Sequence, residues 1–266
     1  MKVSRKCKII LQHQADVPFK KKKIFQKIAD RYIDGYLFAS IDLAEEWIKA
    51  GIIRDKKKCF ELPASSSVFL HKNKQEARNE LNIAEGNIFL WVGRLNKNKD
   101  PLTVLKAFEK FFLVNTEAQL YMIYHEDDLL ADIKKKINEN YQIKERVHLV
   151  GKVQHTEMAT WYSAADFYIS GSRREGGSFA LTEAMACGCI PIVTEIPASL
   201  TAIQNGAYGL HYHPGNVNEL FKKLLEAIAI SKEEFSDKIQ KYFKEELSAK
   251  AVANRLNNII QNLLTE

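Results

Sequence analysis

Two glutamates eight positions apart mark the part of this chain with the clearest chemistry. The stretch from Glu175 to Gly188 reads EGGSFALTEAMACG, so small residues follow the first glutamate and a helical pattern carries the second, Glu183. A strand-like run, Asp166–Ser170, precedes it and Ile190–Val193 follows, which is the order of a βαβ unit. The turn between strand and helix is therefore expected at the carboxyl ends of parallel strands, where open α/β sheets bind ligands.

The residue types in this turn suit a phosphorylated ligand that carries hydroxyls. The amides of Gly176, Gly177 and Ser178, together with the opening turn of the helix, form a site for phosphate. An acid at each end of the turn can accept hydroxyl groups, one from a sugar and one from a ribose. The pattern therefore predicts a site for a sugar nucleotide.

The same stretch resembles the E-x7-E signature of family 4 of the retaining GT-B glycosyltransferases, written E-G-F-G-L-x-x-x-E-A-M-A-x-G-x-P. Gly177, Ser178 and Phe179 replace its F-G-L, and Pro191 falls one place late. A second run, Gly93–Lys99, reads GRLNKNK and resembles the family's G-R-L-x-x-x-K. The two motifs occur in the family's order. The positions that match the first signature are Glu175, Gly176, Glu183, Ala184, Met185, Ala186, Gly188 and Pro191.

The resemblance implies a role for each residue of the predicted site. It gives the nucleotide diphosphate to Arg94 and Lys99, the donor sugar to Glu175 and the ribose to Glu183. It places Lys152 and Val153 in the loop that holds the base, and His13 opposite the donor sugar across a cleft. The remaining donor-binding positions are Gly93, Gly176, Gly177, Ser178, Phe179 and Ala180.

The chemistry of transfer explains why cations belong in such a site. Breaking a sugar–phosphate bond develops negative charge on the departing diphosphate, and fixed cations and amides speed the reaction where that charge grows. Arg94 offers a planar fork for phosphate oxygens and Lys99 a compact charge. The alternative for both is a solvated basic loop, and Lys97 is assigned to that alternative.

Each of the other candidate side chains also has a structural alternative. Glu183 could be a glutamate on a helix surface in an ordinary salt bridge, and Glu175 a loop acid paired with Arg173 or Arg174. His13 could be a structural histidine at the end of a strand. A buried carboxylate requires a hydroxyl or a cation as a partner, so the partners of both glutamates decide between these interpretations.

No acidic residue of the chain is an evident nucleophile for a double displacement. The family is described as using attack on the same face of the sugar, with the leaving phosphate helping to deprotonate the acceptor. The resemblance therefore implies retention of configuration, no metal and no cofactor. The acids 126–128 could mimic the acidic cluster of metal-dependent transferases, but we interpret them as the start of a helix whose dipole favours acids.

Composition is that of a soluble globular protein. The 266 residues are 46% hydrophobic and 27% charged, and no apolar run approaches the ~20 residues of a membrane span. The four cysteines lack disulfide or zinc spacing, and Cys187 and Cys189 are expected to be buried thiols. With no signal peptide, a reducing, cytoplasmic location is expected.

The formal charge of +6 is modest, and much of it lies in the lysine runs 20–23 and 56–58, which we interpret as solvated faces. The functional alternative is weak attraction to an anionic lipid surface, which would make the protein peripheral to the inner face of the membrane. No aromatic and basic RNA-binding signature accompanies the lysines, so nucleic acid is not an expected partner.

Strands and helices alternate along almost the whole chain. A helix over Lys22–Tyr32 is expected, and Ser40 is expected to cap a second helix that Gly51 ends. A closing helix is expected over Glu246–Leu264. The predicted strands are 8–12, 35–39 and 59–62 in the N-terminal part, then 88–92, 119–124, 147–150, 167–170, 190–194 and 209–212. The last six make a complete Rossmann-like domain.

The predicted fold is therefore α/β of the GT-B type, with an incomplete first domain. Residues 1–74 are assigned to a partial acceptor-side domain and linker, 75–245 to the donor domain, and 246–266 to a helix packing back on the N-terminal part. Three strands are too few for the family's acceptor domain. An internal start, a fragment and a partner that supplies the missing half all remain open, and self-association through the exposed sheet edge is expected.

Two other functional classes are considered. A truncated module that binds sugar nucleotides with little or no transfer is favoured by the short N-terminal part and opposed by the intact site residues. A different Rossmann-like enzyme would need a G-x-G-x-x-G turn after its first strand, and this sequence has none. The acceptor, the donor base and the donor sugar stay open.

Overall fold

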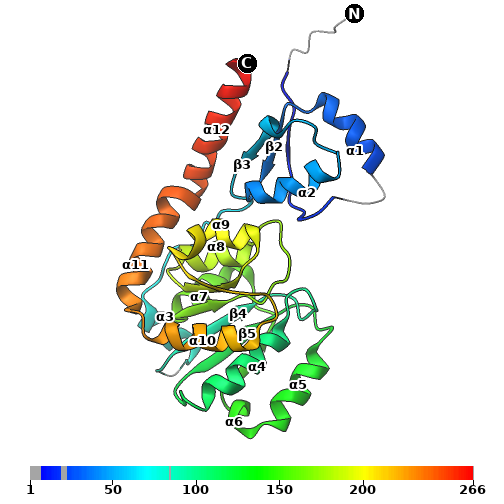
Figure 1. Cartoon of the computed structure of the whole chain (residues 1–266). Coiled ribbons are helices and arrows are strands. Elements are labelled where there is room, and N and C mark those ends of the chain that lie inside the picture. Colours follow the sequence, from blue (N-terminus) through cyan, green and yellow to red (C-terminus); the bar gives the residue numbers. More distant parts are fainter. Residues whose placement is uncertain (1–6, 19–22, 84, 266) are drawn as a thin grey trace, which may run out of the picture.

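The computed structural model describes residues 7–18, 23–83 and 85–265, and it contains two parallel β-sheets (Figure 1). Three strands form a sheet in the N-terminal part and six form a second sheet in the remainder. The predicted α/β class is thus confirmed. Most of the lysine run 20–23 lies outside the described residues, as does the predicted start of the first helix at Lys22.

The N-terminal sheet has the order β1-β2-β3, and each adjacent pair of strands is parallel. All four residues of the central strand are buried. The elements are β1 (Ile10–Gln12), α1 (Lys23–Ala29), the 3₁₀ turn η2 (Asp30–Tyr32), β2 (Gly35–Phe38), η3 (Ile41–Leu43), α2 (Ala44–Lys49), η4 (Lys56–Lys58) and β3 (Cys59–Glu61).

The helix after β2 begins differently from the prediction. Ser40 stands at the N-cap of η3, but its side chain makes no capping hydrogen bond. The amide of Ile41 instead donates to Oε2 of Glu61 at 3.0 Å, because β3 ends beside this turn. The predicted stop is confirmed: Gly51 has a φ of 63°, a left-handed angle that suits glycine after a helix.

Lys58 is not the solvated side chain that the basic run predicted. Its Nζ donates to the carbonyl oxygens of Asp30 and Ile33, each at 2.9 Å, and lies 3.8 Å from the buried Asp30 carboxylate. Lys58 therefore satisfies backbone carbonyls at the end of the first helical segment. The other two lysines of the run are exposed, as expected.

The six-stranded sheet has the order β6-β5-β4-β7-β8-β9, and every adjacent pair is parallel. Counted from its first strand, this is the order 3-2-1-4-5-6 of the Rossmann fold, which confirms the prediction. The order reverses between β4 and β7. The strands are β4 (Ile88–Val92), β5 (Gln119–Ile123), β6 (Val147–Gly151), β7 (Phe167–Ile169), β8 (Ile190–Thr194) and β9 (Leu210–Tyr212).

The helices around this sheet form two groups, as their mutual contacts show. One group joins α3, α7, α8 and α11, and the other joins α4, α5, α6 and α10. A cluster of aromatic rings that includes Phe89, Phe108 and Phe167 fills the core. The helices are α3 (Lys74–Leu81), α4 (Pro101–Phe112), α5 (Leu130–Glu139), α6 (Tyr141–Lys144), α7 (Met158–Ala164), α8 (Phe179–Ala186), α9 (Pro197–Ala202), α10 (Val217–Ile228) and α11 (Lys232–Tyr242).

The chain closes with α12 (Ala249–Thr265), which runs up beside the N-terminal sheet (Figure 1). A π-helical turn, η7 (Phe243–Leu247), replaces the predicted start of this helix at Glu246. Ser248 is extended, and its hydroxyl accepts the Ala251 amide, so the new helix begins there. Leu263 packs with Leu37 and Leu62, which places α12 over one face of the small sheet.

None of the helices in the described ranges combines the length and the hydropathy that a membrane span requires. Cys187 and Cys189 are buried and unbridged, as the sequence predicted. Burial raises the pKa of the Cys187 thiol to about 12, so neither residue is placed to act as a thiolate.

Candidate functional site

A cavity of about 520 Å³ opens at the carboxyl ends of β4, β5, β6 and β7, where the strand order reverses. Ligands of open α/β sheets bind at this position. The cavity brings together every predicted site residue except His13 and Gly176. Its lining consists of Val92, Gly93, Arg94, Lys99, Ile123, Tyr124, His125, Lys152, Val153, Gln154, His155, Met158, Glu175, Gly177, Ser178, Phe179, Ala180 and Glu183.

The turn that carries Glu175 leads directly into α8. Ser178 is the N-cap, and its Oγ accepts the Leu181 amide at 3.3 Å. Ser178, Phe179 and Ala180 at the start of α8 line the cavity, and the positive end of a helix dipole favours an anion there. A phosphate site at this turn stays a prediction.

Both glycines of this turn are required by the close approach of the N-terminal part. A Cβ at Gly176 would lie 2.1 Å from the Gln14 carbonyl oxygen, and one at Gly177 would lie 2.4 Å from the Ala64 Cβ. Neither distance is possible between such atoms. Gly176 thus serves the contact between the two parts of the chain, which explains why it lies outside the cavity lining.

Glu175 forms an ion pair with Lys99, whose Nζ lies 2.6 Å from Oε1. The glutamate side chain is only 7% exposed. The alternative partners named from the sequence are engaged elsewhere: Arg173 bonds Asp100 at 2.7 Å and Arg174 bonds Asp16. The two motifs of the sequence therefore meet in one contact inside the cavity.

Arg94 and Lys99 belong to the loop between β4 and α4. Arg94 is half-exposed and lies 3.7 Å from Glu126, so it is free to turn towards an anionic ligand. Asp100 is the N-cap of α4, which puts Lys99 just before the helix. Lys97 is exposed and outside the lining.

Glu183 lies within α8 and has a side chain that is 13% exposed. Its Oε1 lies 2.9 Å from Nε2 of His155, and its Oε2 accepts the Tyr162 hydroxyl at 3.1 Å. The hydroxyl partner that a buried carboxylate needs is therefore a tyrosine of the neighbouring helix α7. Glu183 still lines the cavity, so a ligand can reach it.

His13 follows β1 and lies among the rings of Phe38 and Trp47, with centroids 5.0 and 4.7 Å away. Its Nε2 is buried and has no hydrogen-bond partner among the described residues. Burial lowers the pKa of His13 from 6.5 to about 4, so the imidazole is neutral at pH 7. The structure thus shows a buried aromatic environment together with one unsatisfied ring nitrogen.

The acids 126–128 lie just before α5, the helix start that was predicted, but none of them caps it. The N-cap of α5 is Leu129, without a side-chain capping bond, and Glu126 pairs with Arg94. Among the described residues, the one cluster with metal-ligand spacing is Glu195, His213 and Glu219. The two ring nitrogens of His213 already contact the two glutamates, so these three side chains satisfy one another. None of the three lines the cavity.

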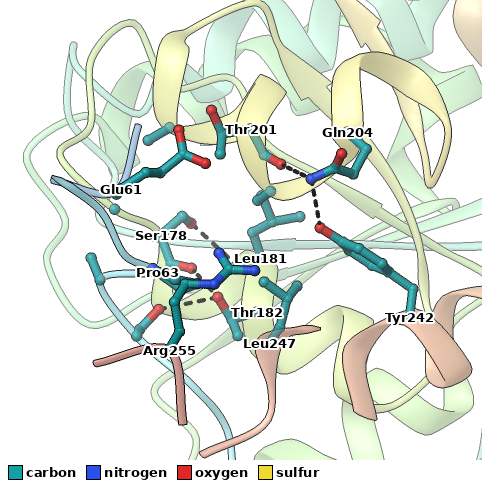
Figure 2. A pocket seen from close by; sticks show the side chains of 16 residues that line it. Glu61, Pro63, Ser178, Leu181, Thr182, Thr201, Gln204, Tyr242, Leu247 and Arg255 are labelled. Atoms are coloured by element: carbon teal, nitrogen blue, oxygen red, sulfur yellow. Dashed lines mark hydrogen bonds between the residues drawn. The ribbon is translucent and has the colours of Figure 1, made fainter. Parts of the chain in front are cut away.

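A second, smaller cavity of about 40 Å³ lies between the start of α8, the linker after β3 and the C-terminal helices. Figure 2 shows Glu61 of β3, Tyr242 of α11 and Arg255 of α12 around it, with Ser178 at the N-cap of α8 and Thr182 within that helix. The Thr182 hydroxyl lies 3.1 Å from that of Ser65. Elements from both sheets and the linker thus support the turn from behind.

Sequence reasoning missed three contributors to the site. His155 and Tyr162 contact Glu183, and Asp16 joins the N-terminal loop to Arg174 beside Glu175. Tyr162 lies in an apolar pattern of helical spacing, which predicts a core residue and not a site residue. Asp16 and Arg174, which form the ion pair, are 158 positions apart in the sequence, so no local pattern could have paired them.

Comparison with known proteins gives this geometry a context. Residues 73–246 match the family described as Glycosyl transferases group 1. The alpha-monoglucosyldiacylglycerol synthase of Streptococcus pneumoniae is 26% identical over 196 residues, which are 72% of this chain and 44% of that protein. The GDP-mannose:cellobiosyl-diphosphopolyprenol alpha-mannosyltransferase of Xanthomonas campestris is 30% identical over 115 residues, 43% of this chain and 30% of that protein. The matches thus span less than half of either relative.

Among solved structures, Anabaena Alr3699/HepE in complex with UDP-glucose superimposes with a TM-score of 0.79 at 15% identity. The match covers 97% of this chain and 72% of that one. At this identity the likeness shows the fold, which is the α/β architecture of GT-B glycosyltransferases.

Proposed function

The chain belongs to the glycosyl transferases group 1 family, and from that premise we propose a retaining, metal-independent glycosyltransferase of the family 4 type. Its donor is a nucleotide diphosphate sugar and its acceptor carries a hydroxyl. The observation that carries the proposal is the single cavity that joins the Lys99–Glu175 pair, the start of α8 and Glu183. One cavity thus offers a cation, open amides and two acids to one ligand.

Each end of the ligand has matching side chains. The diphosphate lies at the α8 amides, where Lys99 and Arg94 neutralise the negative charge that grows as the sugar–phosphate bond breaks. Glu183 accepts the ribose hydroxyls, while Lys152 and Val153, which follow β6, contact the base. Gly93 leaves room for the side chains of Trp91 and Lys99, since a Cβ there would lie 3.2 Å from Trp91 and 3.5 Å from Lys99.

The sugar lies between the two parts of the chain. Glu175 accepts its hydroxyls, and we assign to the same sugar His13, whose Nε2 has no hydrogen-bond partner in the described part of the chain. Because His13 is neutral at pH 7, it directs a hydroxyl without adding charge. No carboxylate stands free as a nucleophile in the lining, since Glu175 is paired with Lys99, so same-face attack assisted by the leaving phosphate is the proposed route.

The names of two relatives favour a lipid-linked acceptor, because one names a diacylglycerol and the other a diphosphopolyprenol. We therefore propose acceptors that are presented at a membrane, reached from the cytoplasm by weak attraction of the basic chain to anionic lipid. No membrane span is needed for this, and no nucleic acid or cofactor is part of the proposal.

One observation favours a second candidate, a sugar-nucleotide-binding module with little or no transfer. The N-terminal sheet has three strands, whereas the acceptor is recognised largely by that part in the family that this chain resembles. Donor hydrolysis and transfer assays on the purified chain separate the candidates, because a module binds the donor without consuming it. Retention is checked by the anomeric configuration of the product in NMR spectra.

The two glutamates provide the sharper test of the site. Glu183→Gln should weaken binding of the nucleotide even without a sugar, since ribose is common to all such ligands. Glu175→Gln should weaken mainly the full sugar nucleotide. Calorimetry that gives the opposite pattern would contradict this assignment of the two acids.

A further inference from the structure

Glu183 is held by donors on both of its oxygens. Tyr162 of α7 is fully buried and donates its hydroxyl to Oε2, while Nε2 of His155 in η5 (His155–Glu157) lies 2.9 Å from Oε1. Burial, and then the nearby Glu183, raise the pKa of Tyr162 well above its ordinary value. Its hydroxyl therefore stays a donor throughout the accessible pH range.

His155 would be mobile without a further contact, because its side chain is 71% exposed. The ring of Phe69 lies against it, with centroids 4.9 Å apart, and Phe69 also lies 6.3 Å from the Tyr162 ring. Phe69 belongs to the segment that links the two sheets. Its neighbours Val68 and Leu70 are 83% and 81% exposed, so Phe69 alone of the three turns inward.

The linking segment is fixed along its length. Nδ1 of His71 lies 2.7 Å from the Cys187 carbonyl oxygen, and Ser65 bonds Thr182. Both partners belong to α8 or its end, the helix that carries Glu183. Phe69 is thus anchored on each side to the element whose glutamate it helps to hold.

We propose that His155 and Tyr162 are positioning residues for Glu183, and that Phe69 of the linker holds His155 in place. The inference rests on the proposed role of Glu183 as the ribose ligand. A carboxylate offers about four acceptor positions, and two of these are taken by the tyrosine and the histidine. The remaining two point in fixed directions, as two neighbouring ribose hydroxyls require, and a group ordered beforehand binds at a lower entropic cost.

A purely structural role for these residues predicts a different result. Loss of packing would lower the melting temperature and weaken all nucleotides alike. A positioning role predicts a loss confined to ligands that carry ribose hydroxyls. The decisive quantity is therefore the ratio of affinities for a nucleotide and for its 2′,3′-dideoxy form.

The experiment measures this ratio by calorimetry for UDP and GDP in the whole chain. Tyr162→Phe, His155→Ala and Phe69→Leu should each reduce the ratio about tenfold, on the order of one charge-assisted hydrogen bond. His155→Gln keeps a donor and should restore most of it. Tyr121→Phe, which removes a buried hydroxyl bonded to Gln119, and Leu70→Ala, on the exposed side of the linker, are matched controls and should leave the ratio unchanged.

The outcomes separate this inference from the function on which it rests. A wild-type protein that binds UDP or GDP more tightly than the dideoxy form, with variants that keep the ratio, would overturn the positioning role alone. A wild-type protein without preference for ribose hydroxyls would overturn both the role of Glu183 and this inference. A reduced ratio in Tyr162→Phe and His155→Ala with unchanged melting temperatures supports it.

Discussion

The Lys99–Glu175 ion pair unites the two motifs of the sequence in a nearly buried contact of 2.6 Å. A buried carboxylate is costly without a cation, and Lys99 supplies that cation for Glu175 near the start of α8. In the proposed reaction the same lysine neutralises phosphate, which means that Lys99 is shared between the protein's carboxylate and the ligand's diphosphate. Arg94 is different, because its partner Glu126 is half-exposed and does not line the cavity.

This sharing leads to a prediction for the two cations. Arg94→Ala and Lys99→Ala should each weaken binding of a nucleotide diphosphate by about 1.5–3 kcal/mol, the usual loss for a charge-assisted hydrogen bond. Affinity for the nucleoside should barely change, because it has no phosphate. Lys97→Ala, in the same loop but outside the cavity, is the control for general electrostatics. Equal losses for nucleoside and diphosphate would show that neither cation touches phosphate.

His13 gives a prediction about pH. Its pKa falls to about 4 in the folded protein because burial strips its hydration, against 6.5 for an exposed histidine. Between these values the unfolded chain binds the proton more readily, so stability is complete above pH 6.5 and declines as pH falls towards 4. In His13→Phe this contribution is gone, and urea unfolding at pH 7 and pH 4.5 should show a smaller decline. An unchanged decline would mean that His13 is not the group responsible.

Periodicity and turn residues predicted most of the secondary structure. Each of the nine predicted strands corresponds to an observed one, because runs of buried apolar residues between glycine and polar turns are local signals. The predictions failed where a distant residue decides the local structure. Ser40 loses its capping role to Glu61, and the closing helix starts at Ala249 after a π-helical turn that no propensity marks.

The site was predictable to the same extent. All but two of the predicted site residues line the cavity, since the residues of each motif are close in sequence and lie at strand ends. The partners of the acids were not predictable. Asp16 and Arg174, like His155 and Glu183, meet only through the packing of separate elements.

The closing helix α12 offers a test of how the elements support one another. Leu263 is 5% exposed and packs on the N-terminal sheet, whereas its neighbour Leu264 is 58% exposed. Leu263→Ala should lower the free energy of unfolding by about 2–5 kcal/mol, the range for a buried leucine. Leu264→Ala should change it by less than about 0.5 kcal/mol. Similar effects of the two substitutions in urea unfolding would contradict the packing of α12 on this sheet.

In the whole molecule the small sheet depends on its neighbours for cover. α12 covers one face, α2 packs on the other through Trp47, and the Asp16–Arg174 pair joins this part to the turn that leads into α8. The first helix is the exception. α1 buries none of its described residues, and Ile24 and Phe25 are 74% and 75% exposed.

Such a surface, together with the exposed Ile9 and Leu11 at the first strand, should make the purified chain self-associate, because apolar patches and strand edges invite pairing. Light scattering should show species larger than the monomer at micromolar concentration. Phe25→Ser should shift the distribution towards the monomer, while Val114→Ser, at an exposed apolar residue that follows α4, should not. A monomeric wild-type chain would contradict this prediction.

The central claim, that the cavity at the start of α8 binds a nucleotide diphosphate sugar, is tested most directly by thermal shift. The panel consists of UDP, GDP, ADP and their sugar conjugates, added to the wild-type chain and to Glu183→Gln. One base should stabilise the wild-type protein by about 2.7 kcal/mol at 100 times its dissociation constant, with the sugar conjugate at least as effective, and the variant should lose most of this gain. No stabilisation by any member of the panel, or equal stabilisation of wild type and variant, would contradict the account.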